Sequence, residues 1–466
     1  GLLYHFNGSY WEVIDTEYIY NLLGFVYIKL HEFITSELIS QDLDITIIEK
    51  RKKYKLKNIT VFKKRSFKKS MYDYIREQCS KINNPFDQNI YLMGFTNGVY
   101  DLEQNIFRTS RKEDFVSMVV PYEYTPSSEE DIDSIRCYMS KIMPNEEERE
   151  LLLLLLSTCL SGYVLDRFIV CTGLGSNGKD ALFSYLLKYA LGPYFYRANT
   201  TTLTQPAKGD LNVGIANMNK KRAIVFNEPS AHSLIQVTLV KEITGGNEIN
   251  ARGLYSSKTS VDLHNTTFML CNDKPLLDKV DVAIARRLIT FNFRSTFKSE
   301  EFLTENNLIS GENNVFIGDE SVKSSPFLNK YKLPFVNMLL PYFQKYKNNG
   351  FVVTGIPESV ERESRKYMQE SDLLYSWFNA NYEKTTEKKD IIKLKDVFTA
   401  LKESEYYFNL TKAEKRKQSY ASLIEYVERS PLLRLFYKER VKIEKDNVDT
   451  TASNVLTNYK VRDVKK

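Results

Sequence analysis

The chain is poor in the residues that build metal centres and disulfide frameworks. Among its 466 residues there are only five cysteines and four histidines. The cysteines are widely spaced and form no C-x-x-C pair, which argues against a zinc site or a disulfide framework. The histidines show no metal-ligand spacing. We therefore expect an intracellular protein that works in a reducing compartment. The cysteines are Cys79, Cys137, Cys159, Cys171 and Cys271.

Long apolar segments are also scarce. The most apolar run, Leu151–Leu165, is shorter than the roughly 20 residues that a membrane span needs. It is flanked by charges, so it predicts a buried helix, and we expect no membrane association. No signal peptide is visible. The chain begins with Gly1 rather than methionine, so we expect a piece of a longer protein and allow for a further N-terminal domain.

The composition is that of a globular protein with an uneven charge distribution. Hydrophobic residues make up 42% and charged residues 27%, and the length predicts two to four domains. The net charge is only +6, yet residues 50–69 form a dense basic run. This run is either a solvated surface or a surface for nucleic-acid phosphates, because clustered Lys and Arg release counterions on binding. Lys53 and Lys64 represent it as candidate DNA contacts.

Residues 1–131 predict an α+β domain. Asn7-Gly8 and Asn97-Gly98 are hairpin turn signals, and Thr16–Ile39 has helical periodicity. The polar, turn-rich segment Pro126–Asp131 predicts the boundary to a second domain, which we place at 132–300. Two helices, at 132–143 and 146–165, are expected to open that domain.

Residues 165–189 carry the strongest signal in the chain. An apolar strand, Phe168–Cys171, runs into a glycine loop and then a helix, with the spacing Gly173-x-x-x-x-Gly178-Lys179 of a nucleoside-triphosphate phosphate loop. Such a loop aims backbone N–H groups and a helix dipole at the phosphates. Position 180, normally Ser or Thr, is Asp180. The candidate nucleotide-binding residues are Gly173, Gly175, Ser176, Asn177, Gly178, Lys179 and Asp180.

A second signal lies about fifty residues downstream, a separation that suits a phosphate-loop enzyme. The apolar strand Ala223–Phe226 ends in Asn227-Glu228. Beside a phosphate loop, such a strand commonly ends in acidic residues that organise Mg²⁺ and the attacking water. Glu228 suits the water-activating role, and Asn227 stands where a carboxylate is common. The alternative is a buried strand that ends in an exposed acid.

Three further features follow in order. Residues 248–255 and 259–264 predict two strands joined at Ser256–Lys258. A strand then ends at Asn272. Finally, Arg286 and Arg287 are adjacent on a helical pattern and point about 100° apart, so one can face a neighbouring subunit while the other turns inward. Surface salt bridges are the alternative explanation for this pair.

The remainder predicts an insertion and helical extension at 301–385 and a further domain at 386–466. Residues 298–330 have the composition of an exposed insertion. In the last domain, a helix at 394–404, a basic helix at 411–427 and two short strands near Lys438–Arg440 suit a winged helix, with Lys415 as a DNA contact. We expect the tail from Asn447 to be mobile.

These motifs together resemble the superfamily 3 helicase module of the poxvirus-type and satellite-phage-type primase-helicases. The resemblance covers about 165–300 and extends more faintly to residue 1 through Asn97–Asp101. It implies an α/β fold with an AAA+-like phosphate-loop core and a parallel sheet. It also implies an ATPase that uses ATP and Mg²⁺ as a hexameric ring. This ring moves along single-stranded DNA at a replication fork, with a primase domain placed N-terminally.

The resemblance also implies roles for individual residues. Lys179 binds the β- and γ-phosphates, Glu228 activates water, and Asn272 senses the γ-phosphate. Arg286 or Arg287 acts on the next subunit's ATP. The hairpin tip, with Ser257 and Lys258, holds DNA in the channel. A large DNA virus is the implied source, which places the protein at a viral replication site in the host cytoplasm or nucleus.

Two departures from the family pattern suggest compensation. Asp180 replaces a hydroxyl and Asn227 replaces a carboxylate, so we hypothesise that the Mg²⁺-shell carboxylate has moved from the strand to the loop. The candidate metal residues are Asp180, Asn227 and Glu228. Two other functions remain open: an ATP-gated DNA-binding ring or scaffold, and a small-molecule kinase. The arginine pair and the hairpin are superfluous for a kinase.

Overall fold

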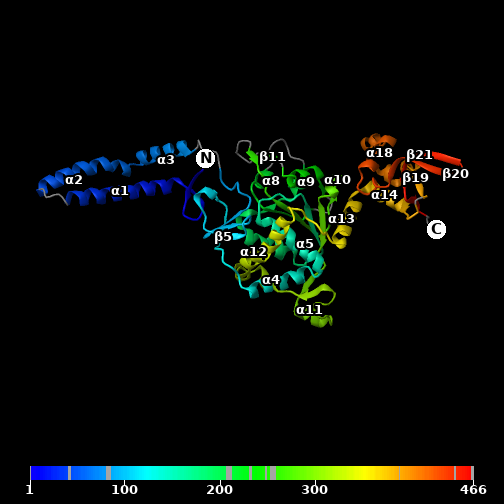
Figure 1. The fold of residues 1–466 in the computed structure, drawn as a ribbon, viewed down its shortest axis with the longest axis horizontal. Coiled ribbons are helices and arrows are strands. Elements are labelled where there is room, and N and C mark those ends of the chain that lie inside the picture. The colour runs from blue at the N-terminus through cyan, green and yellow to red at the C-terminus, as the bar shows by residue number, and fades with distance from the viewer. Residues whose placement is uncertain are drawn as a thin grey trace. The chain divides into compact units, whose positions relative to one another are not determined.

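The fold is described by a computed structural model. It describes residues 2–39, 44–79, 85–205, 213–229, 233–246, 249–251, 259–387, 389–445 and 448–462. The chain forms two compact units, Gly1–Tyr124 and Thr125–Lys466 (Figure 1). The first division therefore falls slightly before the boundary expected after residue 131. In the part of the chain that the structure describes, no helix is long and apolar enough to cross a membrane.

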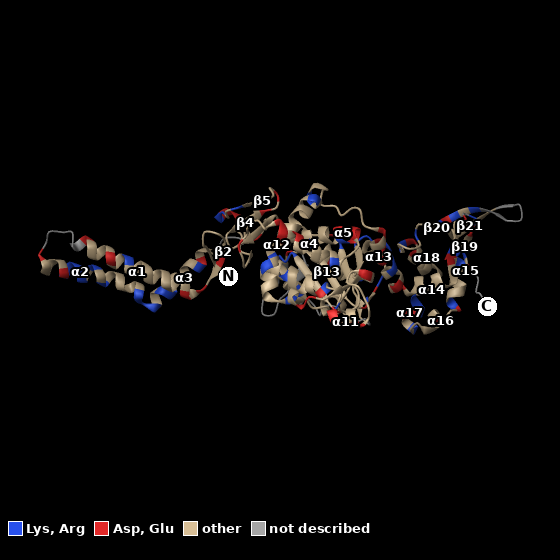
Figure 2. Cartoon of the chain, turned by 90° about the horizontal axis from the view of Figure 1, so that it is seen from below, with Lys and Arg blue, Asp and Glu red and all other residues tan. Residues whose placement is uncertain are grey.

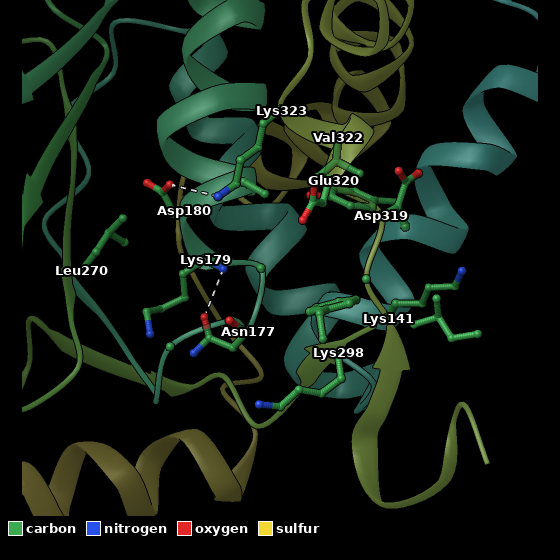
Figure 3. Close-up of a pocket in the computed structure, with 18 of the residues that line it drawn as sticks. Lys141, Asn177, Lys179, Asp180, Leu270, Lys298, Asp319, Glu320, Val322 and Lys323 are labelled. Carbon is green, nitrogen blue, oxygen red and sulfur yellow. Dashed lines mark hydrogen bonds and ion pairs between the residues drawn. The ribbon is translucent and has the colours of Figure 1, made fainter. Parts of the chain in front are cut away.

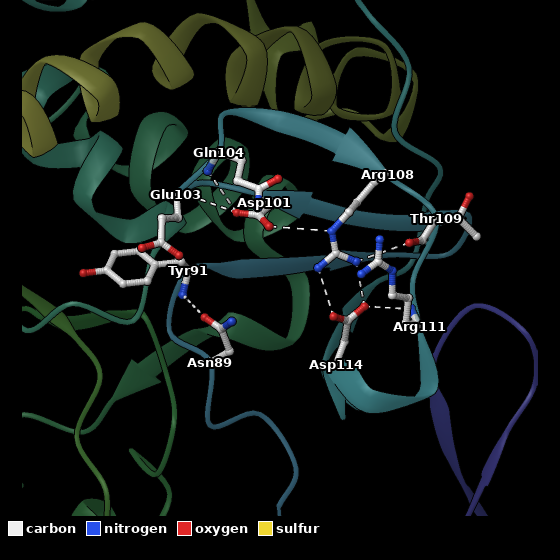
Figure 4. Close-up of polar contacts among 9 residues, drawn as sticks. All are labelled: Asn89, Tyr91, Asp101, Glu103, Gln104, Arg108, Thr109, Arg111 and Asp114. Atoms are coloured by element: carbon white, nitrogen blue, oxygen red, sulfur yellow. Dashed lines mark hydrogen bonds and ion pairs between the residues drawn. The ribbon is translucent and has the colours of Figure 1, made fainter.

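The first unit contains a hairpin and a small sheet. The hairpin consists of β1 (Leu3–Phe6) and β2 (Trp11–Ile14), as the Asn7-Gly8 signal predicts. The sheet has the strand order β5-β4-β3-β6. Arg108 fastens its edge through ion pairs to Asp101 (3.6 Å) and Asp114 (2.8 Å) (Figure 4). Its strands are β3 (Leu92–Phe95), β4 (Gly98–Asp101), β5 (Ile106–Arg108) and β6 (Val119–Val120).

Three helices of the same unit pack together as an arm. They are α1 (Thr16–Ile39), α2 (Ile45–Ile59) and α3 (Arg65–Cys79), and a 3-10 turn, Thr60–Lys63, lies between the last two. The helical range predicted from periodicity matches α1. The basic run falls on α2, the turn and α3 (Figure 2), and Lys53 and Lys64 are exposed there.

The second unit is built on a five-stranded parallel sheet with the order β15-β7-β13-β9-β8. Read across the sheet, these are the fifth, first, fourth, third and second of the five strands along the chain. The sheet is buried, which suits the apolar runs that its strands carry. This confirms the expected α/β class with a parallel sheet. The strands are β7 (Phe168–Thr172), β8 (Phe195–Ala198), β9 (Ala223–Asn227), β13 (Thr266–Cys271) and β15 (Leu288–Asn292).

Helices pack around this sheet. Asn145 caps the start of α5 by accepting a hydrogen bond from the Glu148 N–H. The helix ends at Ser157 and is followed by a single 3-10 turn, Thr158–Leu160. The expected helix at 146–165 was therefore too long, because apolar residues continue past the end of the helix into the buried connection to β7. The larger helices are α4 (Glu129–Ile142), α5 (Glu146–Ser157), α12 (Ser325–Asn348) and α13 (Glu358–Ser371).

Shorter elements complete the unit around the sheet. A π-helical segment, Ala181–Leu187, continues into α6 (Lys188–Leu191) directly after the glycine loop. The others are α7 (Thr201–Thr204), α8 (Val213–Ala216), β10 (Leu234–Ile235), α9 (Val237–Thr244), β11 (Ile249–Ala251), β12 (Thr259–Val261), β14 (Leu276–Leu277) and α10 (Val282–Ala285).

The segment expected as an exposed insertion is partly ordered against the glycine loop. β16 (Thr296–Lys298) and β17 (Val315–Ile317) pair in parallel, with α11 (Glu300–Glu305) between them and a 3-10 turn, Glu320–Lys323, after them. The Phe297 N–H donates to the Ser176 carbonyl (2.8 Å). The segment is polar because one of its sides faces solvent, while its other side packs against the glycine loop.

The C-terminal residues have a core of their own within the second unit. β19, β21 and β20 form an antiparallel sheet in that order. The tail from Asn447 is not loose, since Val455, Leu456 and Tyr459 are buried; Asn447 itself lies outside the described residues. The strands are β18 (Tyr382–Lys384), β19 (Ile391–Lys393), β20 (Tyr437–Lys445), β21 (Val448–Thr457) and β22 (Tyr459–Val461).

The helices of this region correct one expectation. The predicted basic helix at 411–427 is two helices, because Ser419 caps a new one by accepting a hydrogen bond from the Ser422 N–H. The basic residues are thus confined to a short helix, α17. The helices are α14 (Leu373–Asn381), α15 (Leu394–Lys402), α16 (Glu405–Asn409), α17 (Lys412–Lys417) and α18 (Tyr420–Arg429).

Candidate functional site

The carboxyl ends of three neighbouring strands meet around one cleft. β7 leads into the glycine loop, β9 into Glu228 and β13 into Asn272, and the strands run in parallel with β13 in the middle. After β7 the chain crosses to β8 at the edge of the sheet, so the strand order reverses beside β7. Parallel α/β sheets bind ligands at the carboxyl ends of the strands next to such a reversal, which is where the cleft lies. Its volume is about 1130 Å³. Lys179, Glu228 and Asn272 all line it, as does Asp180.

The loop has the curvature of an anion-binding cradle. Positive φ angles occur at Gly173 (145°), Ser176 (59°) and Gly178 (84°), and they fold the backbone into a concave turn. A Cβ atom on Gly173 would lie 2.5 Å from the Phe293 carbonyl oxygen, and one on Gly178 would lie 2.8 Å from the Ile142 side chain. Both positions therefore require glycine. Gly175, by contrast, has nothing within 4 Å of a Cβ position.

Lys179 is a buried cation at the base of this cradle. Its ammonium donates to the Gly173 carbonyl oxygen (2.5 Å), and its backbone N–H donates to Asn177 Oδ1 (3.3 Å) (Figure 3). Asn177 in turn donates to the Phe293 carbonyl (3.4 Å). Burial lowers the pKa of Lys179, and this effect is opposed by its neighbours, Glu228 among them. An anion bound in the cradle would therefore stabilise the charged lysine.

Glu228 occupies a strained backbone position at the cleft. Its φ is 47°, an angle that costs energy for a residue other than glycine and recurs at functional sites. The Glu228 N–H donates to the Leu270 carbonyl (2.8 Å), which fixes the turn against β13. The side chain is exposed at the cleft, so its carboxylate is accessible to a ligand or a water molecule.

Asn227 has a partner that sequence reasoning missed. With its amide oxygen oriented toward Arg197, it accepts hydrogen bonds from Arg197 Nη2 (2.7 Å) and Nε (3.3 Å). Arg197 lies on the edge strand β8 and lines the same cleft. No local pattern marks Arg197 in the sequence, because its role depends on the pairing of β8 with β9. The neutral amide at position 227 therefore faces the guanidinium of Arg197.

Asp180 also has an unexpected partner. It is exposed, and its carboxylate lies 3.8 Å from the ammonium of Lys323, in the turn after β17 (Figure 3). No group of three metal-ligating side chains occurs among the described residues. A site with fewer protein ligands still fits Mg²⁺, because this ion is commonly held by one or two carboxylates together with substrate phosphates. Asp180 and Glu228 are carboxylates that line the cleft.

The two adjacent arginines have different surroundings. Arg287 is buried and pairs with Asp166 (2.6 Å), and it also donates to Thr244 Oγ1 (3.1 Å) and the Ala283 carbonyl (3.0 Å). Arg286 is 61% exposed and lies 3.3 Å from Asp166. Both precede β15 and so lie at the amino edge of the sheet, away from the cleft of their own chain. The two side chains thus differ in burial, while both pair with the Asp166 carboxylate, as the salt-bridge alternative also expects.

The residues predicted to contact DNA are only partly described. Ser257 and Lys258 lie outside the described residues, although β11 and β12, which flank them, pair antiparallel as expected. Lys53 and Lys64 are exposed on the arm. Lys415 is half-buried and donates to the Phe408 carbonyl (2.7 Å), so it stabilises the end of α16 and is less accessible than its neighbours on α17.

Comparison with known proteins identifies viral relatives. Residues 1–144 match the family described as D5 N terminal like. "Putative helicase L207/L206" of Acanthamoeba polyphaga mimivirus is 31% identical over 421 residues, which are 86% of this chain and 43% of the relative. "Primase D5" of fowlpox virus is 28% identical over 281 residues, covering 57% of this chain and 35% of the relative. The chain thus spans less than half the length of these relatives.

A solved structure shows only distant similarity. The A form apo structure of NrS-1 C terminal region matches with a TM-score of 0.37 and 10% sequence identity, over 73% of this chain and 80% of that chain. A score this low does not assign the fold. The similarity to viral proteins therefore rests on the sequence relatives and on the D5 N terminal like segment.

Proposed function

Because the chain belongs with the poxvirus-type primase-helicases, we propose that it is the helicase part of a viral replication protein. It would hydrolyse ATP to move along single-stranded DNA at a replication fork, as a hexameric ring, with a primase domain elsewhere in the longer protein. The observation that carries this proposal is the meeting of Lys179, Glu228 and Asn272 at one edge of a parallel sheet.

The cradle would bind the triphosphate of ATP. Backbone N–H groups between Gly173 and Gly178 face the phosphates, and Lys179 donates to the β- and γ-phosphate oxygens in place of the Gly173 carbonyl. Bound Mg²⁺ supplies positive charge against the phosphate oxygens. Asp180 and Glu228, two of the carboxylates that line the cleft, would hold it. Asp180 would then exchange its contact with Lys323 for the metal.

Hydrolysis would be divided between two subunits. Glu228 accepts a hydrogen bond from the attacking water and orients it, while Asn272 contacts the γ-phosphate. Arg286, exposed at the far edge of the sheet, would reach the cleft of the next subunit and stabilise the transferring phosphoryl group. Arg287 would hold Asp166 and so position the turn that presents Arg286. A head-to-tail contact of this kind closes into a ring when the rotation permits.

DNA would be held by phosphate contacts. The tip that contains Ser257 and Lys258 would enter the channel of the ring, and the exposed Lys53 and Lys64 of the arm would bind the fork duplex. A winged-helix-like C-terminal region would add contacts from α17. The second candidate function is an ATP-gated DNA-binding ring or scaffold with little or no unwinding, and Asp180 in place of a hydroxyl is the feature that favours it.

DNA-stimulated ATP turnover distinguishes the two functions. The wild type, Lys179→Ala and the matched control Lys188→Ala, an exposed lysine on the same helix, are assayed with and without single-stranded DNA. The proposal predicts turnover that rises with DNA, is lost in Lys179→Ala and is unaffected in Lys188→Ala. Nucleotide and DNA binding without turnover in the wild type would instead establish the scaffold.

A further inference from the structure

The cleft is larger than a phosphate site requires. Its volume of about 1130 Å³ slightly exceeds the range for pockets that enclose an entire small molecule, roughly 300–1,000 Å³. The glycine loop and the strand ends form only one wall. The facing wall comes from α4, β16, β17 and the start of α12, and includes Tyr138, Phe297, Ile317 and Phe327.

This facing wall is aromatic and begins where the cradle ends. A Cβ position on Gly178 lies 3.3 Å from Phe297 Cε2, so the Phe297 ring packs directly on the phosphate loop. The Phe297 N–H also donates to the Ser176 carbonyl (2.8 Å), which ties the backbone of β16 to the loop. Farther along, the Tyr138 and Phe327 rings lie 5.9 Å apart. Ile317 is 43% exposed beside them.

Polar groups stand at the rim of the aromatic wall. Lys141, Asp319 and Glu320 lie on the side of the cleft opposite Leu270 (Figure 3). Burial raises the pKa of Tyr138, and nearby Asp319 raises it further. The Tyr138 hydroxyl is therefore neutral at physiological pH and can donate a hydrogen bond, while the Asp319 carboxylate can accept one. A purine has a flat aromatic face and an edge that carries both donors and acceptors.

We propose that Tyr138, Phe297 and Phe327 form the subsite for the purine base of a nucleotide whose phosphates occupy the glycine loop. This inference rests on the proposed function, since it assumes that the cradle binds a triphosphate. The segment at 296–327 is then part of the nucleotide site. Stacking of a base on an aromatic side chain contributes about 10- to 100-fold in affinity, and a pyrimidine, which has one ring, gains less.

A comparison of ligands with and without a base tests this subsite. The affinities of ATP, UTP and inorganic tripolyphosphate, each with Mg²⁺, are measured by calorimetry for the full chain. In the wild type, we expect ATP to bind about 10- to 100-fold more tightly than tripolyphosphate, with UTP between them. Phe327→Leu and Phe297→Leu should reduce that ratio about tenfold. In Phe327→Leu the affinity for tripolyphosphate should stay unchanged.

Controls separate this inference from the proposed function. Lys179→Ala should weaken all three ligands, and Phe302→Leu, an aromatic change in the same segment outside the cleft, should alter none. Tyr138→Phe keeps the ring and should preserve the stacking gain if a larger substitution fails to fold. Equal affinities of ATP and tripolyphosphate in the wild type, or an unchanged ratio in both leucine variants, would overturn the subsite and leave the cradle intact. Failure of every ligand to bind would overturn the proposed function itself.

Discussion

Replacement of the two adjacent arginines should separate catalysis from folding. Arg286 is 61% exposed and its ion pair with Asp166 is 3.3 Å long, so Arg286→Ala should change the free energy of unfolding by less than about 1 kcal/mol. If Arg286 acts on the neighbouring subunit's ATP, however, its loss should lower the rate of ATP hydrolysis about 10³- to 10⁵-fold. The variant should be folded and inactive.

Arg287→Ala should mainly lower the free energy of unfolding. The substitution removes an ion pair to Asp166 (2.6 Å) and hydrogen bonds to Thr244 (3.1 Å) and the Ala283 carbonyl (3.0 Å). Burial lowers the pKa of Arg287 and Asp166 opposes that effect, so the guanidinium depends on its partner. Because Asp166 is 41% exposed, the cost falls below that of a fully buried pair, at roughly 2–4 kcal/mol.

Urea unfolding and ATP turnover on the same preparations measure both effects. Mixing then tests the action between subunits. An equal mixture of Arg286→Ala and Lys179→Ala chains should recover turnover, because about one interface in four pairs an intact Lys179 with an intact Arg286. The reasoning is refuted if Arg287→Ala abolishes turnover with unchanged stability, or if Arg286→Ala remains as active as the wild type.

Three further substitutions have defined outcomes. Asp180→Ser should alter the Mg²⁺ concentration for half-maximal ATP turnover, and an unchanged value would reject the idea that this carboxylate joins the metal shell. Gly178→Ala should abolish nucleotide binding, because its φ of 84° and the Ile142 side chain at 2.8 Å exclude a Cβ, whereas Gly175→Ala should bind nearly normally in the same titration. Burial raises the pKa of the Asp281 carboxyl, but the hydrogen bonds from Lys241 and the backbone amides of α10 outweigh this effect and hold that pKa below its usual range. Its stabilisation should therefore be present above pH about 4 and fade as pH falls further, so the stability gap between wild type and Asp281→Asn, measured by urea unfolding, should narrow in acid.

Short-range patterns predicted much of the fold. The Asn7-Gly8 turn and the helix Thr16–Ile39 depend on local geometry, and both stand as expected. The glycine loop could be predicted because its glycine spacing lies within a few residues, and Gly173 and Gly178 adopt the positive φ angles that such a turn requires. The end of α5 was misjudged because Leu160 and Leu165 are as apolar as the helix itself while belonging to a buried connection.

Long-range contacts were not accessible from the sequence. Arg197 contacts Asn227 only because β8 pairs with β9, and Lys323 faces Asp180 only because the turn after β17 returns to the loop. The polar composition of 298–330 concealed this return, since a segment can be exposed on one side and line a cleft on the other. The buried Val455 likewise shows that a charged tail can supply a core strand.

Imaging of particles assembled with single-stranded DNA and a nonhydrolysable ATP analogue tests the central claim most directly. The account predicts six-fold rings with DNA density in the channel. In each ring, Arg286 of one subunit should lie against the γ-phosphate held by Lys179 of the next. Monomers under these conditions, or rings in which Arg286 faces solvent, would contradict it.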